Sequence, residues 1–261
     1  NTADVNVDGA SFANCSTTSA VDLAGYGGAI RAGLGNSKIK IKNTTITGCH
    51  AKVGGALSVE TAQTTLDTTT ITGNNYCDDA NQAIVHCKDA SLALEGASTI
   101  TGNKPTSDGK TCSYVVGSDG ACQITLGDTT SITGNQFTGG RTGSSAVFMN
   151  SASTLSVSGG VQVTGNTDGA AEKNVYLTGS SNNIQVTGDL TDTANIGVTM
   201  ETEARKAAGQ QFGVTTAKPA SEVAKLDHLY QDGNTAYVGT AGTDTAVVWK
   251  YEPEGCRNQQ T

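Results

Sequence analysis

The sequence predicts an all-β fold: a right-handed parallel β-helix of about seven three-stranded coils, closed by a small C-terminal α/β cap. Four observations lead to this prediction. Gly is abundant (33 residues) and Pro is rare (3 residues), charged residues make up only 15% of the 261, and short apolar runs recur between turn residues. Finally, a pentapeptide returns at a nearly constant period, which is typical of solenoid proteins.

The repeated unit is Thr-Ile-Thr-Gly-Asn or a close variant of it. Its copies begin at Thr45, Thr70, Thr99, Ser131, Gln162 and Gln185, and a degenerate copy occupies residues 11–15. The central apolar residues of the six copies are 25, 29, 32, 31 and 23 positions apart. Two further short apolar runs precede the unit in each period, as at 83–85 and 92–94. Three short strands per period are typical of a parallel β-helix.

Each position of the unit has a physical reason. In a strand, neighbouring side chains point to opposite faces, so the Ile enters the core while both Thr residues face outward. The Gly that follows permits a sharp corner, because it accepts positive φ. The Asn three residues after the Ile is predicted to point inward and to stack on the Asn of the next coil. The repeat therefore predicts an asparagine ladder along one corner.

Two cysteines occupy this ladder position in adjacent coils, Cys15 and Cys49. Stacked residues of neighbouring strands lie roughly 4.8 Å apart, which is inside the Cα range for a disulfide. A Cys15–Cys49 bond is therefore expected, in place of two ladder asparagines.

The remaining cysteines leave alternatives open. Equal separations of 35 residues favour the pairs Cys77–Cys112 and Cys87–Cys122, and the sequential alternative is Cys77–Cys87 with Cys112–Cys122. Cys256 is expected to be a free thiol. Seven cysteines in a β-rich chain indicate an oxidising compartment. No Cys-x-x-Cys pair occurs, and only His50, His86 and His228 could complete a metal site, so no metal or cofactor is predicted.

The repeat fades after Val186, and the chain divides into a β-helix at 1–196 and a capping region at 197–261. Short helices are predicted at 200–208 and 220–229, followed by strands at 235–238 and 246–249. A cap is expected because the end of a solenoid exposes a strand edge and an apolar core. Trp249 and Tyr251 are predicted to form the core of this cap.

The segments Gly-Gly-Ala-Ile at 27–30 and Gly-Gly-Ala-Leu at 54–57, together with the Thr-Ile-Thr-Gly-Asn units, carry a family resemblance. The chain resembles the Gly-Gly-Ala-Ile/Phe-x-x-Asn β-helices of bacterial surfaces, including the chlamydial polymorphic outer membrane protein repeats. Its closing stretch, at 195–200, 236–238 and 248–249, is similar to the end of cell-wall-attached β-helix proteins from gut Firmicutes. The resemblance implies a β-helix displayed on a cell surface and implies no activity. The predicted disulfides depart from it.

Net charge and hydropathy exclude several partners. The net charge is −8 and the pI is about 4.8, and no basic stripe is present, so neither nucleic acid nor an anionic membrane surface is an expected partner. No apolar run approaches the roughly 20 residues of a membrane-spanning helix, so no membrane insertion is predicted. A monomeric solenoid that is secreted or displayed on a cell surface is the expected state.

An enzyme is disfavoured, although it remains the first alternative. Asn166-Thr167-Asp168-Gly169 matches the Asn-Thr-Asp motif of polygalacturonases, but the Asp-Asp, His-Gly and Arg-x-Lys elements of that family do not follow it. Asn166 is better interpreted as a ladder asparagine. A polysaccharide lyase needs a basic residue beside an acidic calcium site, and no acidic cluster accompanies the outward row Lys38, Lys40 and Lys42.

The predicted function is therefore an adhesin-type binding or stalk module that recognises a host glycoprotein, immunoglobulin or glycan without catalysis. Recognition is expected in irregular insertions at 75–82, 104–110 and 136–144, since loops on a rigid scaffold commonly carry binding. The candidate residues are Asn75, Tyr76, Asp78, Asp79, Lys104, Asp108, Lys110, Gln136, Phe137 and Arg141. A weaker alternative is ice binding, which would use the outward Thr ranks.

Overall fold

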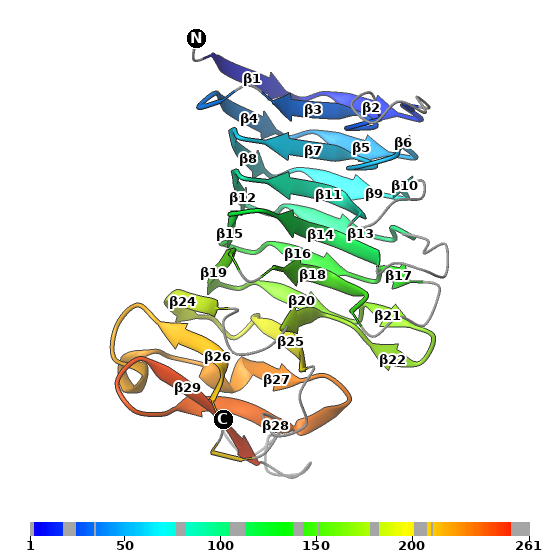
Figure 1. Ribbon diagram of the computed structural model, residues 1–261. Helices are drawn as coiled ribbons and strands as arrows, with labels where there is room; N and C mark the ends of the chain where they lie inside the picture. The colour runs from blue at the N-terminus through cyan, green and yellow to red at the C-terminus, as the bar shows by residue number, and fades with distance from the viewer. Residues whose placement is uncertain are drawn as a thin grey trace.

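The computed structural model describes residues 3–17, 25–33, 35–76, 82–104, 113–137, 143–150, 152–177, 183–200, 208–209 and 211–251. The protein is a parallel β-solenoid, whose coils stack from the N-terminus at one end to a smaller antiparallel region at the other (Figure 1). The predicted all-β solenoid is confirmed.

Three columns of strands run along the solenoid. The first column consists of β3 (Ile30–Gly33), β7 (Leu57–Glu60), β11 (Gln82–Lys88), β14 (Ser113–Asp119), β18 (Ser145–Met149) and β23 (Val175–Leu177). The second consists of β1 (Asp4–Asp8), β4 (Lys38–Lys42), β8 (Gln63–Asp67), β12 (Ser91–Glu95), β15 (Gln123–Leu126), β19 (Thr154–Gly159), β24 (Asn183–Leu190) and β26 (Gln211–Thr216). The third consists of β2 (Ser11–Ala13), β5 (Thr45–Thr47), β9 (Thr70–Thr72), β13 (Thr99–Thr101), β16 (Ser131–Thr133), β20 (Gln162–Thr164), β25 (Asn195–Met200) and β27 (Leu229–Gln231).

Every pairing between successive coils in these columns is parallel. Two short ladders lie beside the columns: β6 (His50–Ala51) pairs with β10 (Asn75–Tyr76), and β17 (Gln136–Phe137) pairs with β21 (Thr167–Asp168), which turns back to β22 (Ala171–Glu172). In the described part of the chain, the coils from β3–β5 to β23–β25 make six complete turns. The first of the seven predicted coils is partial, because it contributes only β1 and β2 to the columns.

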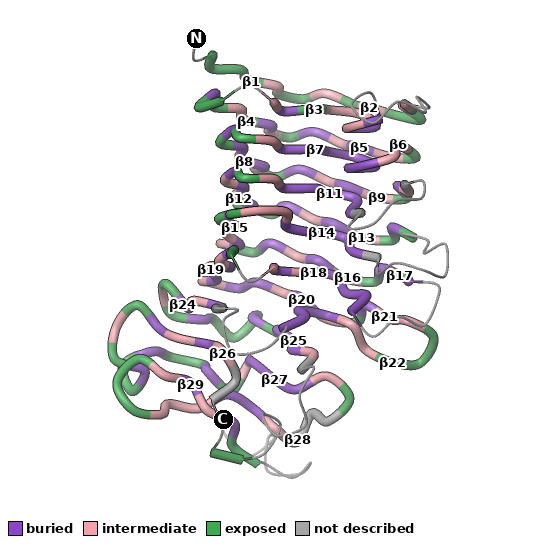
Figure 2. Tube along the Cα trace, in the orientation of Figure 1, coloured by how far each residue is buried: buried purple, intermediate pink, exposed green. Residues whose placement is uncertain are grey.

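The core follows the predicted alternation of side chains. In the third column Ile46, Ile71, Ile100, Ile132, Val163 and Ile196 stack in register. Each is at most 1% exposed, whereas the flanking Thr, Ser or Gln side chains are partly exposed. Figure 2 shows the buried positions alternating with partly exposed ones along the coils. The inward assignment of the repeated apolar residue is therefore correct for the first five copies. The copy at 185–189 is assigned to the wrong column: Val186 is buried but belongs to β24 of the second column, in register with Val157, and Ile196 takes the place predicted for it. The reason is that β23 and β24 must complete the first two columns of this coil before the chain returns to the third.

The asparagine ladder is present and runs in one direction. Each amide donates from Nδ2 to Oδ1 of the next: Asn74 to Asn103 (3.1 Å), Asn103 to Asn135 (3.0 Å), Asn135 to Asn166 (2.8 Å) and Asn166 to Asn174 (2.9 Å). These amides also donate to core-strand carbonyls, such as that of Ile71, and all five side chains are buried. The ladder thus satisfies backbone groups at a corner that solvent does not reach.

A second ladder occupies the corner between the second and third columns. Here one residue per coil has positive φ: Gly9, Asn43, Thr68, Gly96, Asp128 and Gly159. Thr69 and Ser98 lie just beyond this point, and their hydroxyls donate to the carbonyls of Ile41 (3.0 Å) and Leu66 (3.1 Å) in the preceding coils. Gly, Asn and Asp tolerate the left-handed conformation, and Thr68 is the β-branched exception.

The C-terminal cap differs from its prediction in two respects, the first of which is its helical content. The predicted helix at 220–229 is two 3₁₀ turns, η2 (Ala220–Glu222) and η3 (Leu226–His228), because Lys225 between them has φ 60° and interrupts helical geometry. Leu229 then begins β27, which extends the third column. The other predicted helix, at 200–208, falls almost entirely outside the described residues.

The two predicted cap strands are present as β28 (Asn234–Ala241) and β29 (Ala246–Tyr251). They pair antiparallel with each other, and β29 also pairs antiparallel with β26, so the direction of the strands reverses at this end. Trp249 is 1% exposed and belongs to the core, as predicted. Tyr251 is 54% exposed, so its assignment to the cap core is wrong, because it lies at the outer end of β29.

Asp232 of the cap ends the asparagine ladder. Asn174 donates to it from Nδ2 (2.6 Å to Oδ1) and from its backbone N–H (2.9 Å to Oδ2), and the Thr199 hydroxyl donates to Oδ2 (2.6 Å). The carboxyl is the last acceptor of a series of amides that all donate toward it. Burial raises the pKa of Asp232 to about 6, with a smaller contribution from the charge of Glu172, while these hydrogen bonds oppose the shift.

This pKa predicts how the cap responds to pH. A folded-state pKa above the ordinary value of 3.8 means that the folded protein binds the proton more tightly than the unfolded chain. The stabilising contribution is therefore complete below about pH 4 and is lost as the pH rises through about 6, and it amounts to about 3 kcal/mol. We expect Asp232→Asn to flatten the decline in melting temperature between about pH 4 and pH 6, measured by circular dichroism.

The matched control is Asp227→Asn, which changes an exposed carboxyl of the same cap. It should keep the pH dependence of the parent protein. In Asp232→Asn the new NH₂ group faces groups that themselves donate hydrogen bonds, namely Asn174 and the Thr199 hydroxyl, so the absolute stability of this variant is expected to fall. Only the pH dependence of its stability therefore tests the role of the Asp232 pKa. Equal slopes in the parent and in Asp232→Asn would contradict it.

Candidate functional site

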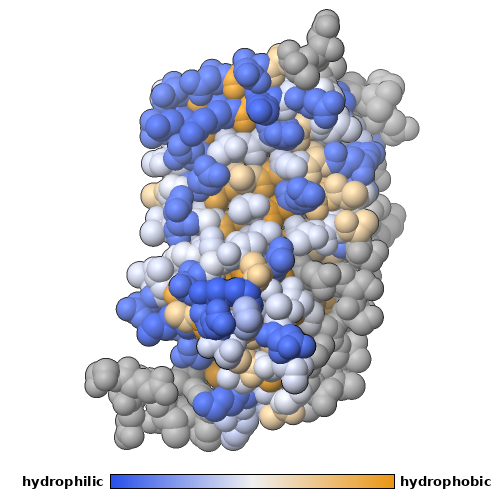
Figure 3. All heavy atoms as spheres, turned by 90° about the vertical axis from the view of Figure 1, so that its left-hand side faces the viewer, coloured by the Kyte–Doolittle hydropathy of each residue, from blue (hydrophilic) through white to orange (hydrophobic). Residues whose placement is uncertain are grey.

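The outer face of the second column is the candidate site. Figure 3 looks onto this side of the molecule: polar side chains gather over the first coils and again over the cap, with a paler surface between them. Because inward and outward positions alternate, the outward side chains of β4, β8, β12 and β15 form continuous rows across the coils. The central row runs Lys40, Thr65, Ala93, Thr125 and Ser156.

A hollow of about 370 Å³ lies at the N-terminal end of this face. Its lining combines aliphatic and polar groups from three neighbouring strands: Asp4, Val5, Asn6, Lys38, Ile39, Lys40, Gln63 and Thr65. Aliphatic surface together with a few hydrogen-bonding side chains is the usual composition of a site for a small ligand or for one monomer unit of a bound polymer.

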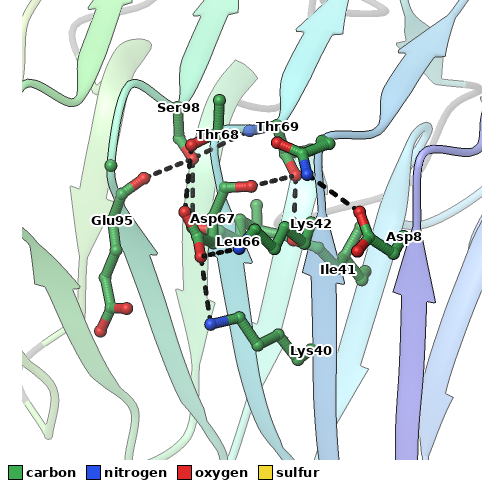
Figure 4. A network of polar contacts seen from close by, with 12 residues as sticks. Asp8, Lys40, Ile41, Lys42, Leu66, Asp67, Thr68, Thr69, Glu95 and Ser98 are labelled. Atoms are coloured by element: carbon green, nitrogen blue, oxygen red, sulfur yellow. Dashed lines mark hydrogen bonds and ion pairs between the residues drawn. The ribbon is translucent and has the colours of Figure 1, made fainter.

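Ion pairs between coils fix one border of the hollow. Asp67 on β8 lies 3.1 Å from Lys40 Nζ and 3.9 Å from Lys42 Nζ, both on the preceding β4 (Figure 4). The Thr68 hydroxyl donates to the same carboxylate (3.0 Å). Bonding to the Lys40 ammonium, and then to Thr68, lowers the pKa of Asp67 below its ordinary value. The lysine row is thus partly neutralised within the protein.

The outward row of lysines is also flanked on its other side by acids. Asp4 and Asp8 on β1 pair in register with Lys38 and Lys42, and Asp8 accepts a hydrogen bond from Asn43 (2.9 Å). Cross-strand pairs of opposite charge contribute modestly to the sheet. The sequence pattern indicated the lysines but not Asp67, although Asp67 follows Lys42 by the local period of 25 residues.

The third column presents the predicted ranks of hydroxyls. Thr45, Thr70 and Thr99 are in register, and so are Thr47, Thr72, Thr101, Thr133 and Thr164. The first rank changes to Ser131 and then to Gln162 toward the C-terminus. Within it the Thr99 hydroxyl donates to the Thr70 hydroxyl (3.3 Å), and Thr164 is bonded to Tyr230 of the cap (2.6 Å). The alignment of the two ranks is confirmed.

The outer side of the first column is largely buried. His86, on β11, is 3% exposed and lies 3.4 Å from the Ser58 hydroxyl. Burial lowers the pKa of His86 below its ordinary value. Nearby, Arg31 and Glu60 form a bidentate salt bridge, in which Arg31 Nε donates to Glu60 Oε1 (3.1 Å) and Nη2 donates to Oε2 (2.9 Å). It lies beside a hollow of about 540 Å³. These charges are engaged with each other.

Half of the residues predicted to carry binding fall outside the described part of the chain, namely Asp78, Asp79, Asp108, Lys110 and Arg141. Among the others, Asn75 and Tyr76 form β10, and Lys104 and Gln136 are exposed. Phe137 is 3% exposed and belongs to the hydrophobic core, so it is not available as a binding residue. Asn75, Lys104 and Gln136 directly follow the ladder asparagines of three successive coils, so they lie along one corner: the Lys104 N–H donates to the Asn74 carbonyl (3.4 Å) and the Gln136 N–H to the Asn103 carbonyl (3.1 Å).

Asn166 is a ladder amide, completely buried, with Nδ2 donating to the Ile132 carbonyl (2.8 Å) and to Asn174. The structure therefore supports the ladder interpretation of the Asn-Thr-Asp motif. Among the described residues no group of three His, Cys, Asp or Glu side chains is placed to hold a metal ion. In the same part of the chain no helix is long and apolar enough to cross a membrane.

The four described cysteines are free thiols, so neither the Cys15–Cys49 nor the Cys87–Cys122 bond is formed in this structure. Cys15 and Cys49 occupy equivalent positions at the head of the asparagine ladder, and the Cys49 N–H donates to Asn74 Oδ1 (2.8 Å). Cys77, Cys112 and Cys256 lie outside the described residues.

Cys87 and Cys122 are neighbours but are not equivalent positions, contrary to the expectation from their equal spacing. Cys87 lies within β11 in register with Ser118, whereas Cys122 precedes β15 at the corner. The Cys122 Sγ is nevertheless 2.9 Å from the Cys87 carbonyl oxygen.

The fold and this face define the chain as a parallel β-solenoid with a polar, grooved outer face. A comparison with protein-family models gives no match, and comparisons with curated proteins and with solved structures give none either.

Proposed function

We propose that this chain is an extracellular, surface-displayed binding module of the adhesin type, which recognises a glycan or glycoprotein of a host without catalysis. The observation that carries the proposal is the hollow on the outer face of β1, β4 and β8, which Asn6, Gln63 and Thr65 line together with Lys38 and Lys40, whose methylene stems are aliphatic. Amides and hydroxyls exchange hydrogen bonds with sugar hydroxyls, and aliphatic surface packs against the sugar C–H groups.

The rigid scaffold supports the same proposal. Successive coils repeat at roughly 4.8 Å, so the rows beyond the hollow extend a regular polar surface on which several units of a chain could bind. Small side chains such as Thr65 and Ser156 leave this surface open. The insertions predicted to carry recognition remain candidates for additional contacts with the same ligand.

The test is a screen of the purified protein against immobilised mucin glycans, immunoglobulins and plant polysaccharides, followed by affinity measurements on the best ligand. Gln63→Ala and Lys38→Ala alter exposed side chains of the hollow, so each should leave stability unchanged to within about 0.5 kcal/mol. We expect Gln63→Ala to weaken binding about tenfold, because it removes a hydrogen-bonding group at the ligand. Thr101→Ala, on the face of the third column, is the matched control and should bind normally.

Two other results would replace this proposal. New oligosaccharide ends in the incubated polysaccharides, detected by mass, would indicate a carbohydrate-active enzyme. Ice binding is the second candidate, favoured by the aligned ranks of Thr47, Thr72 and Thr101 on the third column. In that case the protein would slow the growth of ice crystals, Thr101→Lys would abolish the effect, and Gln63→Ala would not.

A further inference from the structure

Among the described residues, the N-terminal coil pairs with one neighbouring coil. Among the described strands, β1 pairs with β4, and β2 pairs with β5. Its inward residues Val5, Val7 and Phe12 are less completely buried than their counterparts in later coils. A bond between this coil and the next would therefore restrain a part of the described solenoid that is less tightly packed.

Cys15 and Cys49 lie where this coil meets the next one. Backbone pairing brackets the two residues: Ala13 is in register with Thr47, the His50 N–H donates to the Cys15 carbonyl (2.8 Å), and Ser16 bridges to His50. Cys15 is thus stacked directly on Cys49 at the spacing of adjacent strands, which lies within the Cα range of a disulfide. Cys49 Sγ also lies 3.8 Å from the Phe12 carbonyl oxygen of the first coil.

The two thiols differ in accessibility. Cys15 is partly exposed, whereas Cys49 is 1% exposed and sits behind it against the Thr47 carbonyl oxygen (3.3 Å). Burial raises the pKa of the Cys49 thiol. In contrast, both members of the other described pair are closed off, since Cys87 is 0% exposed and Cys122 is 1% exposed. A reagent in solution can therefore reach only one of the four thiols directly.

We propose that Cys15 and Cys49 are a redox-active pair in the folded protein. A low-molecular-weight disulfide oxidises the two thiols to a Cys15–Cys49 disulfide bond, which joins the first coil to the second. Cys87 and Cys122 stay reduced for as long as the fold is intact. This inference is independent of the ligand-binding proposal.

The reaction proceeds by two thiol–disulfide exchanges. The Cys15 thiol loses its proton, and the thiolate attacks one sulfur of the disulfide reagent, whose S–S bond breaks and releases one thiolate that takes up a proton. The Cys49 thiolate then attacks Cys15 Sγ in the mixed disulfide, forms the Cys15–Cys49 bond and releases the second thiolate. The two cysteines are oxidised, and one molecule of disulfide is reduced to two thiols.

The experiment treats the folded full chain with oxidised glutathione, quenches with acid, alkylates the remaining thiols under denaturing conditions and maps the peptides by mass. The parent protein and a Cys77→Ser, Cys112→Ser, Cys256→Ser background are run in parallel, so that a folding defect in the background leaves the parent as a readout. We expect a cross-linked peptide containing Cys15 and Cys49, with Cys87 and Cys122 fully alkylated.

Two variants separate the steps. Cys49→Ser should accumulate glutathione on Cys15, because no resolving thiol follows, whereas Cys15→Ser should leave Cys49 unmodified. Closing the bond should also slow hydrogen exchange of the Val7 and Phe12 amides by at least about tenfold, and a reductant should reverse this. The proposal is overturned if Cys15 and Cys49 are both recovered alkylated, or if Cys87 and Cys122 are oxidised in the folded protein at a similar rate.

Discussion

Replacing Ile100 by Asp is expected to lower the free energy of unfolding by about 4–5 kcal/mol. Ile100 is 1% exposed and stacks between Ile71 and Ile132 in the third column. An aspartate there finds no charged or hydrogen-bonding partner among the apolar side chains, and protonation of its carboxyl would remove only part of the cost. Urea denaturation followed by circular dichroism measures the change.

Thr101→Asp is the matched control, since it introduces the same carboxyl one residue later on the same strand. Thr101 faces outward and is partly exposed, so this change should cost less than about 1 kcal/mol. If the two variants lost similar stability, the alternation of inward and outward residues would not govern the energetics of the coil.

Replacing Asn135 by Ala is expected to cost about 3–4 kcal/mol, because it breaks the asparagine ladder in the middle. Asn135 Nδ2 donates to the Ile100 carbonyl (3.0 Å) and to Asn166 Oδ1 (2.8 Å). Its Oδ1 accepts from the backbone N–H and from Nδ2 of Asn103, each at 3.0 Å. The truncation leaves these buried groups without their partner, and it does so in three successive coils.

Gln136→Ala is the control for Asn135→Ala, because Gln136 is the next residue in the chain, also carries an amide side chain, and is exposed. It should change the free energy of unfolding by less than about 0.5 kcal/mol. We would measure both variants by urea denaturation at neutral pH. A cost for Asn135→Ala no larger than that of the control would mean that the ladder is a by-product of the turn and does not stabilise the stack.

The repeat could be predicted from the sequence because its determinants are local. Thr45-Ile46-Thr47 alternates with the period of a strand, Gly48 has the positive φ (62°) that its corner requires, and the ladder position follows by counting. Each coil needs the same strand and the same corner, so the same short sequence recurs. The stacking of Cys15 on Cys49 could be predicted for the same reason.

The cap could not be predicted in the same way, since it does not repeat. The composition of residues 220–229 is compatible with a helix, but Leu229 pairs instead with Ile196 of the last coil as part of a parallel strand. Closing the open strand edges satisfies more backbone groups than a short isolated helix would. Asp232 likewise becomes the end of the ladder only because β27 brings it beside Asn174.

Of the candidate site, the sequence indicated the outward lysines and the outward Thr ranks but neither the hollow nor its partners. Lys40 and Asp67 belong to different coils, and only the register of β4 with β8 makes them neighbours. Phe137 shows the reverse error: it belongs to an insertion that composition marks as exposed, yet it packs into the core.

The sequence by itself determined the solenoid, the direction of each repeated side chain and the asparagine ladder, because strand alternation and glycine corners act over a few residues. Only the tertiary structure decided where the ladder ends, which charges meet on the outer face and which thiols solvent reaches. Those properties depend on how many residues each coil inserts before the next strand pairs, and hence on packing between segments that are distant in the chain.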